Sequence, residues 1–137
     1  MKIEILNRSR ERIPESLLTR DARSVVRMLG RTNGVQSVTI VCVRPNESQR
    51  LRWKYLKKNK PANVLSFNYG DYAEVILTPA VIYRDARREG VPGETALRRM
   101  LIHGLLHVQG FDHEGTRARA RSFERWEKTI LTKHGIQ

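Results

Sequence analysis

The chain has 137 residues, with 26 lysines and arginines, 14 aspartates and glutamates, and one cysteine. Its length is typical of one domain with one hydrophobic core, and its 39% of hydrophobic residues excludes a disordered tail, a collagen-like rod and a disulfide scaffold. The formal net charge of +12 favours a polyanionic partner, above all nucleic acid.

The first part of the chain alternates between strand and helix signals. Residues 1–6 predict a short strand. A helix is expected from Pro14, whose missing N–H suits a first helical turn, to Gly30, which favours a helix end. Residues 35–43 are rich in β-branched side chains on both faces, which predicts an interior strand covered on each side.

The second part of the chain begins with a helix and continues with a hairpin. Asn46 or Ser48 is expected to cap a helix that runs to about Lys58. Residues 63–67 and 73–77 predict two strands joined by a short glycine-containing loop, which favours antiparallel pairing. Three further helices are predicted over residues 79–88, 94–109 and 116–134. In the last helix, the side chains expected to be buried are Phe123, Trp126, Ile130 and Leu131.

These elements predict an α+β fold in which about five helices cover a small mixed sheet. The order is β-α-β-α-β-β-α-α-α. Strands separated by helices favour parallel pairing, and the adjacent pair adds one antiparallel neighbour. We therefore expect about four strands, mostly parallel, within a single domain over residues 1–137.

Three of the four histidines lie within eleven residues, in the segment His103-Gly-Leu-Leu-His107-Val-Gln-Gly110-Phe-Asp-His113. His103 and His107 are four residues apart on a predicted helix, so their imidazoles lie about 6 Å apart on one face. Gly110 can end the helix and turn the chain, and His113 can then reach the same ion. Three imidazoles with a fourth position open to water are a ligand set of catalytic zinc, so we predict a zincin-like metal helix.

The residues around this segment refine the prediction. The flanking positions are apolar, so the helix is expected to be buried, where imidazoles need partners and one metal ion would serve all three. Asp112 is the candidate that accepts the second N–H of a ligand imidazole, although it can also cap the turn after Gly110. His134 stands alone in the last turn of a helix and is interpreted as a favourable helix end.

The spacing H-x-x-x-H-x-x-G-x-x-H also occurs in metzincin proteases. Those enzymes have a glutamate directly after the first histidine as general base. Gly104 occupies this place here, which disfavours proteolysis. A metallopeptidase remains an alternative only if Asp71 or Glu74 reaches the water on the metal.

The histidine segment resembles the H-G-x-L-H-L-x-G-Y/F-D-H motif of the YbeY family, metal-dependent endoribonucleases of ribosomal RNA maturation. Residues 61–67, Pro-Ala-Asn-Val-Leu-Ser-Phe, are similar to that family's P-T-D/N-V-L-S-F strand. The resemblance implies that His103, His107 and His113 bind one zinc ion per chain. It also implies hydrolysis of single-stranded RNA in the 3′ end maturation of small-subunit ribosomal RNA and in ribosome quality control, with ribosomal RNA or the small ribosomal subunit as partner.

The chain departs from the family pattern in the helix before that strand. Leu56 stands where the family has an arginine of the active site, and leucine cannot hold a phosphate. The candidate RNA-binding replacements are Lys54, Lys57, Lys58 and Lys60. These lysines can equally form a solvated helix face. A second hypothesis is therefore a ribosome-associated assembly factor whose metal holds the fold, with weak or no catalysis.

The chain shows no predicted membrane or export segment. No run of residues has the length needed to span a bilayer, and the first twelve residues lack the apolar stretch of a signal peptide. Cys42 cannot close an intramolecular disulfide, which fits a reducing compartment. We therefore expect a cytoplasmic protein.

Overall fold

The computed structural model describes residues 1–30, 34–110 and 116–136. The helices and strands in these residues are β1 (Lys2–Asn7), α1 (Glu15–Leu29), β2 (Ser37–Cys42), α2 (Pro45–Leu56), β3 (Val64–Asn68), β4 (Tyr72–Leu77), α3 (Pro79–Glu89), α4 (Gly93–Val108) and α5 (Arg117–Lys133). They form a sheet of order β1-β2-β4-β3, in which β1 and β4 run parallel to β2 and β3 runs antiparallel to β4. The predicted α+β class, order of elements and mixed sheet are confirmed.

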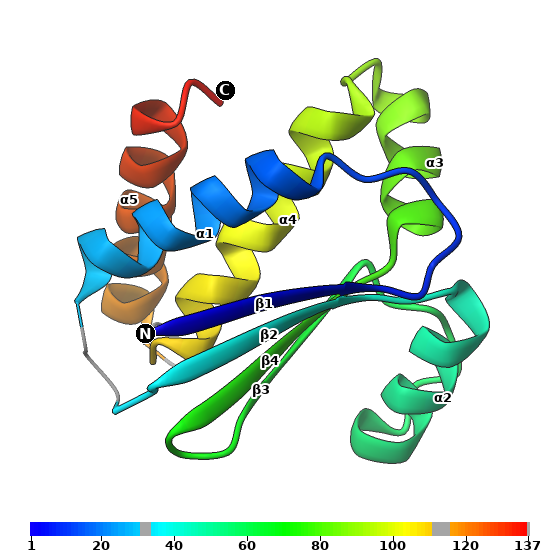
Figure 1. Ribbon diagram of the computed structural model, residues 1–137, viewed down its shortest axis with the longest axis horizontal. Helices are drawn as coiled ribbons and strands as arrows, with labels where there is room; N and C mark the ends of the chain where they lie inside the picture. Colours follow the sequence, from blue (N-terminus) through cyan, green and yellow to red (C-terminus); the bar gives the residue numbers. More distant parts are fainter. Residues whose placement is uncertain (31–33, 111–115, 137) are drawn as a thin grey trace.

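Helices cover both faces of the sheet (Figure 1). The helices α1, α4 and α5 lie on one face, and α2 lies on the other. Because the side chains of β2 alternate between the two faces, Ile40 and Cys42 belong to the larger hydrophobic cluster. Val41 and Val43 belong to a smaller cluster on the opposite face, against which Leu51 of α2 packs. The prediction of an interior strand that is apolar on both faces is confirmed.

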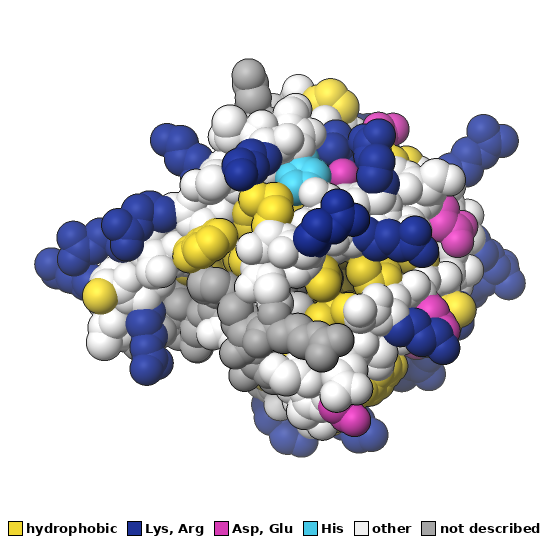
Figure 2. All heavy atoms as spheres, turned by 60° about the vertical axis from the view of Figure 1, so that its left-hand side comes forward, with side chains coloured by type: hydrophobic (Ala, Val, Ile, Leu, Met, Phe, Trp, Pro, Cys, Tyr) yellow, Lys and Arg dark blue, Asp and Glu magenta, His cyan; other side chains and the backbone are white. Residues whose placement is uncertain are grey.

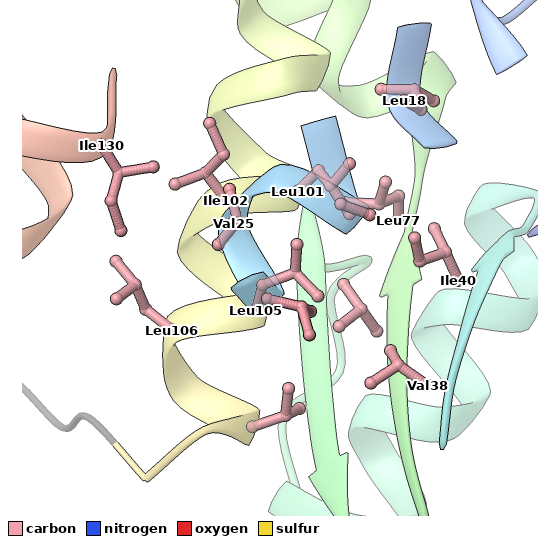
Figure 3. Packing of buried hydrophobic residues seen from close by; sticks show 14 of the residues in the cluster. Leu18, Val25, Val38, Ile40, Leu77, Leu101, Ile102, Leu105, Leu106 and Ile130 are labelled. Carbon is pink, nitrogen blue, oxygen red and sulfur yellow. The ribbon is translucent and has the colours of Figure 1, made fainter. Parts of the chain in front are cut away.

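Helix α4 lies in the middle of the larger layer (Figure 3). Leu101 and Leu105 point toward the sheet. Ile102 and Leu106 point to the other side, toward Ile130 of α5. All five side chains are fully buried, and burial of each contributes about 1.5–3 kcal/mol to folding. These contacts hold α4, which carries two of the predicted metal ligands, firmly between the sheet and α5.

Two local predictions are wrong. Helix α2 begins at Pro45, and neither Asn46 nor Ser48 caps it. Ser48 is buried, and its hydroxyl binds the backbone of Ala62 instead: it accepts from the N–H at 2.8 Å and donates to the C=O at 3.0 Å.

The second wrong prediction concerns Trp126, whose side chain is 38% exposed rather than buried. Within α5, all of which is described, two residues are buried, so its apolar face is too narrow to include this side chain.

The surface carries a strong excess of positive charge (Figure 2). Lysine and arginine side chains are spread over the face shown, whereas aspartate and glutamate side chains are few there. This distribution agrees with the net charge of +12 and with a partner that carries many negative charges. None of the helices in the described residues combines the length and the apolar character that a membrane crossing requires.

Candidate active site

An open cleft of about 880 Å³ lies where the C-terminal half of α4 meets β3. Its walls come from α2, from the segment before β3 and β3 itself, from α3 and from α4. The charged and imidazole side chains among its described lining residues are Arg52, Arg84, Asp85, His103 and His107. The cleft therefore combines cationic groups with potential metal ligands.

His103 and His107 lie side by side on α4 at this cleft, as their spacing predicts. Their Nε2 atoms are 3.1 Å apart, and their ring centroids are 4.7 Å apart. Two nitrogens that each lie 2.0–2.1 Å from one tetrahedral ion would be separated by about 3.3 Å. The two imidazoles therefore have the spacing of neighbouring ligands of a single ion.

Helix α5 holds these imidazoles in place. The ring centroid of buried Phe123 lies 5.1 Å from that of His103 and 4.9 Å from that of His107. One helical turn further on, Oε2 of Glu127 lies 2.7 Å from Nδ1 of His103. This contact favours the tautomer in which Nδ1–H donates to the carboxylate, so that the lone pair of Nε2 faces His107. Glu127 thus orients His103 as carboxylates orient metal-binding histidines.

The sequence reasoning missed Glu127. Glu127 follows Phe123 by four residues, so the sequence could have placed both on the same face of an amphipathic helix. No local pattern identified His103 as the residue that Glu127 contacts. The predicted Asp112 and His113 lie outside the described residues. No group of three or more His, Cys, Asp or Glu side chains suited to a metal ion occurs within the residues that are described. The assignment of His113 as the third ligand therefore stays a prediction from the sequence.

The four predicted RNA-binding lysines lie outside the cleft. All are exposed, and none is among its lining residues: Lys54, Lys57, Lys58 and Lys60. Nζ of Lys54 is 5.2 Å from the ring centroid of Tyr55, and Nζ of Lys57 is 5.8 Å from the ring of Trp53. These lysines place positive charge next to aromatic rings on the surface, outside the cleft, and their RNA-binding role stays a prediction.

The arrangement disfavours the metallopeptidase alternative. A Cβ atom on Gly104 would lie 2.6 Å from Cγ1 of Val75 and 3.2 Å from Oγ of Ser66. Val75 is fully buried, so α4 has no room for a glutamate at this position. Asp71 and Glu74 do not line the cleft. Neither of the two carboxylates on which the metallopeptidase alternative depends therefore lies at the cleft.

The thiol of the single cysteine is expected to be unreactive. Cys42 is fully buried in β2, and burial together with the Glu15 carboxylate raises the pKa of its thiol to about 12. A thiol with this pKa stays protonated at neutral pH, and the thiolate is the form that attacks substrates and binds metals. Cys42 is therefore not suited to act as a nucleophile or a metal ligand at neutral pH.

Comparisons with known proteins identify the family. The family model described as Endoribonuclease YbeY matches residues 4–135. Endoribonuclease YbeY of an Acidovorax species is 34% identical over 103 residues, which cover 72% of this chain and 68% of that protein. The Bdellovibrio bacteriovorus protein of the same name is 30% identical over 129 residues, with 88% and 86% covered. A solution structure of a Thermotoga maritima protein has the same fold, with a TM-score of 0.64 at 22% identity over 96% of this chain and 90% of that one. The chain belongs to the YbeY family of endoribonucleases.

Proposed function

We propose that this endoribonuclease cleaves single-stranded RNA with a zinc ion held by His103, His107 and His113. The observation that carries the proposal is the pair of Nε2 atoms, 3.1 Å apart, at a cleft of a strongly basic chain. Three histidine ligands leave one coordination position open, which is typical of catalytic rather than structural zinc. When bound, zinc supplies Lewis-acid chemistry that polarises a phosphoryl oxygen and activates water near neutral pH.

A row of aromatic side chains supports a single-stranded substrate. Phe67 lines the cleft, and its ring centroid is 5.0 Å from that of Tyr55 and 6.4 Å from that of Tyr69. The ring of Tyr69 stacks in turn on that of Tyr72, with centroids 5.7 Å apart. Tyr55 and Tyr69 are half exposed. Unpaired nucleobases stack on such rings, whereas the bases of a duplex are already stacked inside the helix.

We propose further that the substrate is ribosomal RNA at the 3′ end of the small-subunit molecule, or the small subunit itself. The resemblance of the histidine segment and the net charge of +12 support this assignment. The protein would act in the cytoplasm, as one domain over residues 1–137, in ribosomal RNA maturation and ribosome quality control. Because binding to RNA releases counterions, its affinity is expected to fall steeply with salt.

Leu56 favours a second candidate, an assembly factor with weak or no catalysis. Its side chain lines the cleft and is 52% exposed at the place where the family motif has arginine. An arginine at this position would keep its charge in contact with solvent, so Leu56→Arg should fold normally. The variant should cleave RNA faster if the protein is an enzyme, and it should remain inactive if the protein is an assembly factor.

Metal removal tests the proposed function. Protein treated with a chelator is expected to lose cleavage of a single-stranded RNA, and stoichiometric Zn²⁺ should restore it, because the Lewis acid supplies several kcal/mol of transition-state stabilisation. The rates are followed by gel electrophoresis, with a duplex of the same sequence as the matched substrate. Undiminished cleavage by metal-free protein would contradict the proposed metal dependence. Equal cleavage of the duplex would contradict the preference for single strands.

Glu127→Gln is expected to weaken zinc binding by about 10- to 100-fold while the fold is kept. Glutamine has the shape of glutamate, but it lacks the charge that strengthens the hydrogen bond from Nδ1 of His103. The affinity is measured by competition with a chromogenic chelator. Glu124→Gln, at an exposed position of the same helix, is the control and should bind zinc as the wild type does. Equal affinities of the two variants would show that Glu127 does not orient a ligand.

A further inference from the structure

We propose that Arg52 binds a backbone phosphate of the substrate beside the metal ligands. The inference rests on the proposed function, and it assigns to one residue of α2 the phosphate contact that Leu56 cannot make. Arg52 lines the same cleft as His103 and His107. A cation on this wall is therefore next to the place where a phosphodiester would meet the imidazoles.

The charge of Arg52 is not neutralised by a neighbouring carboxylate. The other arginine among the described lining residues is Arg84, whose Nε lies 3.3 Å from Oδ1 of Asp85. Arg52 takes part in no ion pair within the described residues. Of these two cations, Arg52 is thus the one that has its full charge available for an anion.

The guanidinium of Arg52 also has an unused hydrogen-bond donor. Its Nε is buried and has no hydrogen-bond partner in the part of the chain that is described. A buried donor without a partner is unfavourable, and the penalty is larger for a charged group. A phosphate brings both a compensating charge and several acceptor oxygens, and its geometry matches the planar donors of a guanidinium.

Arg52 lies one helical turn before Leu56 on α2, so its guanidinium can reach the place that an arginine at position 56 would occupy. Residues four apart on a helix lie on the same face, and both Arg52 and Leu56 line the cleft. One helical turn rises about 5.4 Å, a distance that the long arginine side chain can span. The four exposed lysines that follow in the chain lie outside the cleft and are compact point charges without a planar donor set.

Cleavage kinetics of Arg52 variants test this assignment. Arg52→Gln is expected to lower kcat/KM for a single-stranded RNA by about 10- to 100-fold, the loss of a charge-assisted hydrogen bond, with zinc content unchanged. Arg52→Lys should retain part of the rate, and the double variant Arg52→Leu/Leu56→Arg should recover most of it. Arg23→Gln removes the same charge from an exposed position on α1, outside the cleft, and should change the rate less than about twofold.

A binding measurement separates this inference from the proposed function. Fluorescence anisotropy of a single-stranded RNA with metal-free protein gives the slope of log affinity against log salt, which should fall by about 0.7 in Arg52→Gln if one phosphate contact is lost. If the wild type proves inactive, the proposed function fails and the slope still decides the role of Arg52. Wild-type slope and wild-type kcat/KM in a folded Arg52→Gln variant would overturn the inference. If Arg52→Gln does not fold, Arg52→Lys and the double variant Arg52→Leu/Leu56→Arg decide instead. Slow RNA cleavage by this double variant would overturn the inference about Arg52.

Discussion

His107→Ala is expected to lower RNA cleavage at least about 1000-fold, because removal of a ligand forfeits several kcal/mol of transition-state stabilisation by the metal. Nε2 of His107 faces Nε2 of His103 across 3.1 Å, so alanine breaks the pair that defines the site. The imidazole of His107 is only half-buried, which means that alanine leaves no large cavity in the core. Single-turnover cleavage of a labelled single-stranded RNA measures the effect, and circular dichroism verifies the fold.

The fourth histidine is the matched control for this variant. His134 follows α5, and its Nδ1 lies 2.7 Å from the carbonyl oxygen of Ile130, away from the cleft. His134→Ala is expected to keep both zinc and cleavage. Wild-type cleavage by His107→Ala, in a preparation from a strain without other ribonucleases, would contradict the catalytic role of the histidine pair.

Asp21→Ala is expected to lower the free energy of unfolding by about 3–5 kcal/mol, the cost of breaking a buried ion pair from one side. Asp21 of α1 is 1% exposed, and its carboxylate accepts hydrogen bonds from Nε and Nη2 of Arg98 on α4, at 2.6 and 3.2 Å. Nη2 of Arg98 also donates to the carbonyl oxygen of His134, at 3.0 Å. The pair therefore joins three helices of one layer, and alanine would leave the guanidinium buried without its carboxylate.

Urea denaturation of metal-free protein measures this loss. Asp85→Ala is the control, since its ion pair with Arg84 is exposed and should contribute at most about 1 kcal/mol. The double variant Asp21→Leu/Arg98→Met removes both charges and should lose less stability than Asp21→Ala alone. A loss below about 1 kcal/mol in Asp21→Ala would show that the buried pair does not hold the layer together.

Local sequence patterns were sufficient to predict the architecture. Both faces of β2 are apolar, and this alternation alone indicated an interior strand with side chains packed on each side. Pro14 and Gly30 lie at the two ends of α1, as expected from the preferences of proline and glycine. The spacing of His103 and His107 placed both imidazoles on one face of α4, because an α-helix fixes this geometry within a single turn.

Contacts between distant parts of the chain were not predictable in this way. Glu127 meets His103 across 24 residues, and Asp21 meets Arg98 across 77, so no local period links either pair. The role of Arg52 depends on how α2 packs beside β3 and α4, which hydrophobic patterns leave open. Trp126 was misplaced for a similar reason, since its apolar character favoured burial while the narrow apolar face of α5 leaves it at the surface.

X-ray absorption spectroscopy, combined with elemental analysis of the purified protein, tests most directly whether three imidazoles hold one catalytic ion. One zinc ion per chain is expected, with three nitrogen ligands at about 2.0–2.1 Å and one further light-atom ligand. His113→Ala is expected to reduce the nitrogen shell and the zinc content. A sample that takes up no zinc, a zinc shell that contains sulfur, or an unchanged spectrum of His113→Ala would contradict the three-histidine site.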